Sequence, residues 1–155
     1  MSSIATASGK VLVVDDTPTN VKLLADVLRV RGYTVTTATN GEDALSSIAS
    51  DRPDLVLLDV MMPGISGYDV CRRLRSEAAT ALLPVVLVTS LDAQQERIKG
   101  IEAGADDFLN KPINQPELFA RVRSLLRIKA LQDEVSRQAA ALTEWNAKLE
   151  QRVDA

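Results

Sequence analysis

The chain has 155 residues, 46% of them hydrophobic, which suits one domain with an appendage. The formal net charge of −3 excludes a broadly basic surface, so we expect no direct nucleic-acid partner and no membrane partner. Histidine is absent and cysteine occurs once, which excludes histidine chemistry and an internal disulfide and fits a cytoplasmic protein.

Apolar runs predict strands beyond a small, polar stretch at residues 1–8, which we expect to be a flexible tail. In chain order the predicted strands are residues 10–14, 33–38, 54–58, 84–89 and 107–110. The first, third and fourth runs are almost uninterrupted Val and Leu, which is typical of strands buried on both faces of a parallel sheet. The second run alternates, which fits a strand nearer to an edge.

Helical patterns separate these strands, at residues 19–31, 42–50, 67–76, 93–103 and 115–127. In each pattern apolar residues recur on one face, which we expect to pack against the sheet. The expected face includes Ala49 in the second helix, and Ile98 and Ile101 in the fourth. Because strand and helix alternate throughout, the sequence predicts an α/β fold with a doubly wound, five-stranded parallel sheet.

Polar side chains follow the predicted strands at their carboxyl ends, where such sheets bind ligands. Asp15 and Asp16 follow the first strand, and Asp59 follows the third. Thr89 ends the fourth strand and Lys111 follows the fifth. Three carboxylates at one edge repel one another unless a counter-charge lies nearby. Lys111 supplies one positive charge, and hard oxygen ligands with room for water favour Mg²⁺ as the other.

Each of these residues also has an ordinary structural explanation when it is taken alone. An aspartate after a strand often caps the next helix, and Asp59 can belong to a turn before Pro63 and Gly64. Thr89 can be an ordinary strand residue, and Lys111 a solvated loop residue. Their combination at one sheet edge makes a functional interpretation the better one.

Residues 9–127 resemble the receiver domain of two-component response regulators, which has a flavodoxin-like fold. The resemblance rests on the stretches VLVVDD, LVLLDVMMPGISGYD, PVVLVTS and GADDFLNKP. The intervals from Asp59 to Thr89 and from Thr89 to Lys111 also fit this family. The resemblance implies a signalling switch in which Asp59 accepts a phosphoryl group from a sensor histidine kinase or a phosphotransfer protein.

The same resemblance implies roles for the neighbouring residues. It implies a Mg²⁺ site formed by Asp15 and Asp16, one of them acting through water, together with Asp59 and the backbone carbonyl of Met61. Lys111 would contact the incoming phosphoryl oxygens, and Thr89 and Phe108 would form a switch pair that repacks residues 92–127. Pro112 matches a proline whose preceding peptide bond is usually cis. Such a protein would catalyse only its own phosphorylation and dephosphorylation, and would not be an enzyme towards other substrates.

Residues 128–155 extend beyond a minimal receiver and predict a helical coiled-coil linker. The apolar positions repeat every seven residues at Ile128, Val135, Leu142 and Leu149, with Leu131 and Trp145 between them and Gln138 and Arg152 as interruptions. This pattern predicts a homodimer through a parallel pair of C-terminal helices. The alternative is a helix that folds back on its own domain or stays a solvated stub. Because the pattern stops at Ala155, we expect either an output domain beyond it or a tail that is itself the output.

Two other functions remain open from the residues alone. A metal-dependent phosphohydrolase of the haloacid dehalogenase type also forms an aspartyl phosphate, but it carries Asp-x-Asp after its first strand. Here Asp15 and Asp16 are adjacent, which counts against that alternative. A receiver-like module that has lost phosphorylation is disfavoured because all the expected site positions are present.

Overall fold

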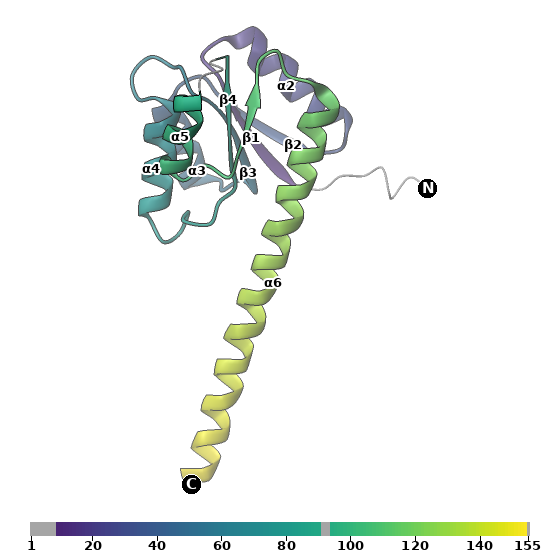
Figure 1. Ribbon diagram of the computed structural model, residues 1–155. Helices are drawn as coiled ribbons and strands as arrows, with labels where there is room; N and C mark the ends of the chain where they lie inside the picture. The colour runs from purple at the N-terminus through teal and green to yellow at the C-terminus, as the bar shows by residue number, and fades with distance from the viewer. Residues whose placement is uncertain (1–8, 91–93, 155) are drawn as a thin grey trace.

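The computed structural model describes residues 9–90 and 94–154, so the predicted tail at residues 1–8 lies outside the described residues. The strands are β1 (Lys10–Val14), β2 (Thr34–Ala38), β3 (Leu55–Asp59), β4 (Val85–Thr89) and β5 (Asp107–Asn110). The helices are α2 (Pro18–Val30), α3 (Gly41–Ser50), α4 (Gly67–Ser76), α5 (Gln94–Ala103) and α6 (Gln115–Asp154). Each bound except the end of α6 lies within one residue of its prediction, with Asp59 itself included in β3, and residue 93 lies outside the described residues. The helix predicted over 115–127 and the predicted helical linker form the single helix α6 (Figure 1).

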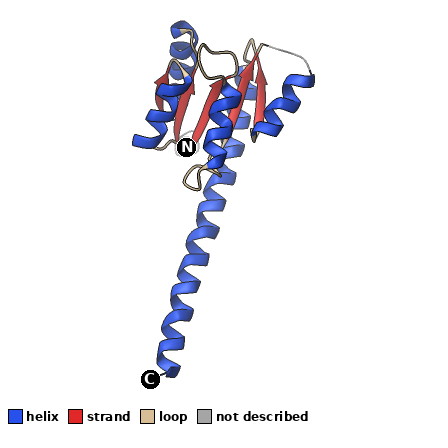
Figure 2. Ribbon diagram, turned by 90° about the vertical axis from the view of Figure 1, so that its left-hand side faces the viewer, coloured by secondary structure: helices blue, strands red, loops and turns tan. Residues whose placement is uncertain are grey.

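The strands form one parallel sheet in the order β2-β1-β3-β4-β5, which confirms the predicted fold class. Helices cover both faces of the sheet, so the central strands are buried on both sides (Figure 2). One core packs α3 and α4 against side chains such as Leu12 and Leu58. The other packs α2 and α6 against the alternate residues, such as Val13 and Leu57. The near-continuous apolar runs therefore have a simple cause, because each residue faces one of two cores.

Glycine at position 67 lets α4 begin directly against β3. A Cβ there would stand 2.5 Å from the backbone oxygen of Asp59, closer than any side chain tolerates. The Gly67 amide donates to the Val60 carbonyl at 3.0 Å, and Ser66 caps the helix by accepting from the Asp69 amide at 3.2 Å. The chain that leaves Asp59 is thus held close to the end of its own strand.

Two of the predicted helix faces are wrong in detail. Ala49 is exposed, and Ile98 and Ile101 are 47% and 64% exposed. The buried face of α5 consists instead of small residues, Gly100 and Ala103. The helix approaches β5 at its smallest residue, because a side chain at Gly100 would overlap the ring of Phe108.

Helix α6 continues without a break beyond the domain (Figure 1). Its first turns pack Leu118, Phe119 and Val122 against the sheet, whereas residues 130–150 are exposed all round. The alternative of a tail folded back on its domain is therefore wrong. The exposed apolar residues of this part, called the apolar stripe below, are Ile128, Leu131, Val135, Leu142, Trp145 and Leu149.

None of the described helices combines the length and the apolar character that a membrane crossing requires.

Candidate functional site

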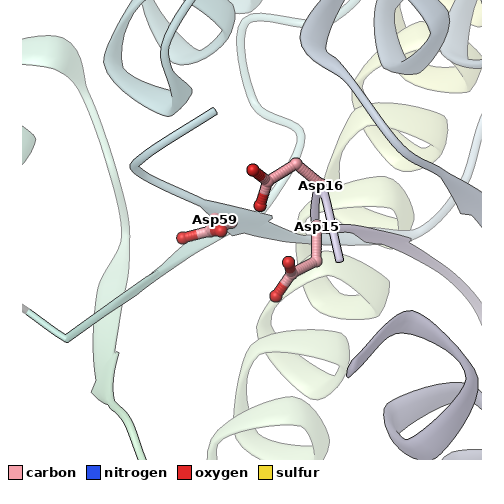
Figure 3. A group of neighbouring side chains, drawn as sticks. All are labelled: Asp15, Asp16 and Asp59. Carbon is pink, nitrogen blue, oxygen red and sulfur yellow. The ribbon is translucent and has the colours of Figure 1, made fainter. Parts of the chain in front are cut away.

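Three carboxylates gather at the carboxyl ends of the neighbouring strands β1 and β3 (Figure 3). One oxygen each from Asp15, Asp16 and Asp59 lies within 4.8 Å of the others. Asp15 and Asp59 are only 2% and 4% exposed, while Asp16 is open to solvent. The fold therefore brings together the acidic residues that the sequence placed at one edge, with one side left accessible.

Asp15 does not act as the cap of α2. Its Oδ1 accepts a hydrogen bond from the amide of Thr17 at 2.9 Å, and Thr17 itself is the residue that precedes the helix. The other oxygen, Oδ2, accepts from Nζ of Lys111 at 3.2 Å. The turn after β1 thus fixes one carboxylate oxygen and leaves the other directed at the site.

Lys111 lies between the two buried carboxylates. Its Nζ is 3.2 Å from Asp15 Oδ2 and 3.4 Å from Asp59 Oδ2. Burial opposes the positive charge, but the carboxylates of Asp59 and Asp15 outweigh burial and raise the pKa of Lys111 above its ordinary value. The backbone amide of Lys111 donates to the Thr89 carbonyl at 2.9 Å, and the Lys111–Pro112 peptide bond is cis, as the resemblance to receiver domains implies.

The Asp59 carboxyl group has too little positive charge around it. Burial raises the pKa of Asp59 to about 6, and the Asp15 carboxylate adds to the rise, although the Lys111 ammonium opposes it. The Met61 amide also lowers the pKa of Asp59, through a long hydrogen bond of 3.4 Å to Oδ1. A divalent cation bound between the carboxylates would relieve this excess, and hard oxygen ligands fit Mg²⁺.

Thr89 and Phe108 point to the same face of the sheet. Phe108 is the register partner of Leu87 on the adjacent strand, and Thr89 follows Leu87 by two residues, so the three side chains share one side. Thr89 is 3% exposed at the end of β4, and Phe108 is half-buried against the core that includes Leu87. The Thr89 hydroxyl and the Phe108 ring therefore lie on the same face of adjacent strands, as a movement that involves both side chains would require.

Two features of this region carry no signal in the sequence. A pocket of about 470 Å³ opens beside Asp15 and Lys111, between α2 and the start of α6, and Leu23 on its wall is 62% exposed. The Tyr68 hydroxyl contacts Glu96 across a separation of 28 residues. An exposed leucine, a helix tyrosine and a first-turn glutamate are all common, so only the fold shows what they adjoin.

Comparison with known proteins agrees with this geometry. The family model of the response regulator receiver domain matches residues 11–123. The response regulator PleD of Caulobacter vibrioides is 51% identical over 134 residues, which cover 86% of this chain and 30% of PleD. The response regulator MprA of Mycobacterium ulcerans is 46% identical over 136 residues, which cover 88% of this chain and 58% of MprA. The chain thus spans less than two thirds of the length of these curated relatives.

A solved structure matches in fold as well. It is the signal receiver domain of a signal transduction histidine kinase from Syntrophus aciditrophicus, with a TM-score of 0.73 and 36% sequence identity. The match covers 77% of this chain and 90% of that one.

Proposed function

The chain belongs to the response regulator receiver domain family of two-component signalling, and on this premise we propose that Asp59 is its phosphoryl acceptor. The observation that carries the proposal is the position of Lys111 between Asp15 and Asp59 at the carboxyl edge of the sheet. A carboxylate held beside a fixed ammonium group can receive a phosphoryl group while its developing charge is neutralised.

The donor is a phosphohistidine on a separate sensor kinase or phosphotransfer protein, since this chain has no histidine. A carboxylate oxygen of Asp59 forms the new bond to phosphorus as the phosphorus–nitrogen bond of the donor breaks. The electron pair of that bond returns to the donor imidazole. Lys111 binds one phosphoryl oxygen, and the hydroxyl of Thr89 binds another. The chain acts only on its own aspartate, so we class it as a switch and not as an enzyme.

The metal would be held by Asp15, Asp16, Asp59 and the backbone carbonyl of Met61. The clustered carboxylates and the raised pKa of Asp59 support this assignment. Bound Mg²⁺ supplies positive charge to the phosphoryl oxygens and to the carboxylates. Asp16 is exposed whereas Asp15 and Asp59 are buried, which suits a ligation by Asp16 that passes through water.

The signal would pass from Thr89 and Phe108 to residues 92–127 and then along α6. We propose residues 9–127 as the receiver and residues 128–155 as a coiled-coil linker to an output domain or partner. The change along α6 from residues that pack against the sheet to residues that are exposed all round supports this division, and the unbroken helix joins the two segments (Figure 1). The comparisons give no support to the phosphohydrolase alternative, and we do not retain it.

Mass spectrometry after treatment with phosphoramidate tests the assignment. We expect the unchanged protein to gain one phosphoryl group with Mg²⁺ and none with EDTA, and Asp59→Asn to gain none. The matched control is Asp54→Asn, which changes an aspartate just before the other end of the same strand and should leave phosphorylation intact. A phosphoryl group on Asp59→Asn, or full modification in EDTA, would contradict the proposal.

A further inference from the structure

A hydrogen bond between Tyr68 and Glu96 joins the first turn of α4 to the first turn of α5. Tyr68 is the second residue of α4, which begins where the segment after Asp59 ends. Glu96 lies in the first turn of α5, which begins where the segment after Thr89 ends. The Tyr68 hydroxyl is 2.6 Å from Glu96 Oε2 and 3.1 Å from the Glu96 carbonyl oxygen, so it donates to both the side chain and the backbone of this turn.

Among the described residues of helix α5, the buried ones are small. Its buried face consists of Gly100 and Ala103, while Ile98 and Ile101 face solvent. Its carboxyl end is fixed by Arg75, whose Nε donates to the carbonyl of Gly104 at 2.8 Å. Tyr68 supplies the corresponding tie at the amino end of the helix.

The chemistry of this contact favours a short, strong hydrogen bond. Burial and the neighbouring Glu96 carboxylate raise the pKa of Tyr68, and the Tyr68 hydroxyl lowers the pKa of Glu96. A neutral phenol therefore donates to an ionised carboxylate over a wide pH range. Glu96 also pairs with Lys99 at 3.5 Å, but both residues belong to α5, so this pair does not connect the helix to another element.

We propose that the Tyr68–Glu96 hydrogen bond positions the first turn of α5 and thereby sets the rate at which Asp59 accepts a phosphoryl group. This inference rests on the proposed function, because the rate concerned is that of Asp59 phosphorylation. The hydrogen bond joins the first turn of α5 to the first turn of α4, which Gly67 places directly against the backbone of Asp59. The amino end of α5 is then already positioned relative to the acceptor, so less rearrangement is needed when the phosphoryl group arrives. Tyr68 and Glu96 are positioning residues that touch no reacting atom.

The first readout is the rate of phosphorylation by phosphoramidate, measured over a range of Mg²⁺ concentrations. We expect Tyr68→Phe and Glu96→Ala each to slow phosphorylation about fivefold, the effect of losing one hydrogen bond of average strength. The apparent Mg²⁺ affinity should stay unchanged, because neither residue adjoins the carboxylates. Glu96→Gln keeps an acceptor oxygen and should retain most of the rate. The double variant should be no slower than either single one, because both remove the same bond.

The second readout is hydrogen exchange in peptides that cover α5. We expect faster exchange at its amino end in Tyr68→Phe and Glu96→Ala, and unchanged exchange in Glu96→Gln. The control is Tyr33→Phe, which removes the other tyrosine hydroxyl of the chain, just before β2 at the opposite edge of the sheet. Rates equal to or above that of the unchanged protein in both Tyr68→Phe and Glu96→Ala would overturn the inference. If the unchanged protein accepts no phosphoryl group, the proposed function is wrong. Hydrogen exchange at the amino end of α5 tests the positioning role independently, because equal exchange in all variants would show that the Tyr68–Glu96 hydrogen bond does not position this turn.

Discussion

A single ammonium group between two buried carboxylates leaves one negative charge uncompensated. Lys111 lies within 3.4 Å of both Asp15 and Asp59, yet burial still holds the pKa of Asp59 near 6. The site is therefore under electrostatic strain that a cation would relieve. Such strain has a cost in folding free energy, and that cost can be measured without any phosphoryl donor.

The Asp59 pKa predicts an unusual dependence of stability on pH. Between about pH 4 and pH 6 the folded protein keeps a proton on Asp59 that the unfolded chain has released, so stability falls as pH rises through this window. In EDTA at about pH 8, Asp59→Asn should therefore unfold with a free energy about 1–2 kcal/mol higher than the unchanged protein. The difference should shrink towards about pH 4, where the native carboxyl is neutral. Urea denaturation followed by circular dichroism measures both values, and a difference that grows on acidification would contradict the prediction.

The site residues could be predicted because each stands next to the end of an apolar run. In a parallel sheet those carboxyl ends lie on one side, so Asp15, Asp59 and Lys111 were expected there, and the strand order then brings them close together. The Tyr68–Glu96 contact could not be predicted, since it depends on how two helices sit beside each other. Neither the tyrosine nor the glutamate breaks the ordinary pattern of its helix.

At the scale of elements, helix α5 shows where apolar patterns mislead. Ile98 and Ile101 were expected on the buried face because burial usually follows hydrophobicity, and yet they face solvent. Between α5 and β5 the space is filled by the ring of Phe108, so α5 approaches β5 at Gly100, which has no side chain. Strands were predicted more closely, because a strand between two cores needs apolar residues at nearly every position.

The contact between Gly100 and Phe108 predicts a reversal of sign in a double variant. In an exposed helix position, replacing glycine by alanine stabilises by about 1 kcal/mol. Here Gly100→Ala should instead destabilise by about 1–2 kcal/mol, because the new methyl group displaces the Phe108 ring. In a Phe108→Ala background the same change should become stabilising. Urea denaturation of the four proteins decides this, with Glu102→Ala on the exposed face of α5 as the control. If Gly100→Ala raised the free energy of unfolding of the otherwise unchanged protein, the prediction would be wrong, because the Phe108 ring would then make room for the methyl group at no cost in stability.

At the scale of the whole molecule, α6 has two faces with different partners. Leu118 and Val122 pack against the sheet of the receiver. With 3.6 residues per turn, Ile128 at the start of the apolar stripe lies about 80° round the helix from Leu118 and about 120° from Val122, and it is 46% exposed. The stripe cannot be covered by the domain that carries the helix. A second copy of the helix offers the same stripe in return, which is the requirement for a symmetric pair.

We predict that the chain dimerises in parallel through the apolar stripe. Ile128 and Val135 are β-branched residues at successive seventh positions, which favours two strands, while Gln138 and Arg152 weaken the pairing. The roughly four heptads should give dissociation constants in the micromolar range, weak enough for a small repacking of residues 92–127 to shift. Sedimentation at about 50 µM should find dimers of the intact chain and monomers of a version that ends at Arg127.

A pair of full-length variants distinguishes the stripe from a general effect of the tail. Val135→Glu places a charge in the stripe and should give monomers, because two like charges would face each other across the pair. Ser136→Glu adds the same charge one residue further on, about 100° round the helix, and should leave the dimer intact. If phosphorylation is coupled to pairing, beryllofluoride with Mg²⁺ should change the dissociation constant of the intact chain and of Ser136→Glu alike. Monomers of the intact chain with and without beryllofluoride would refute the coiled coil, and equal dimerisation of both variants would place the interface elsewhere.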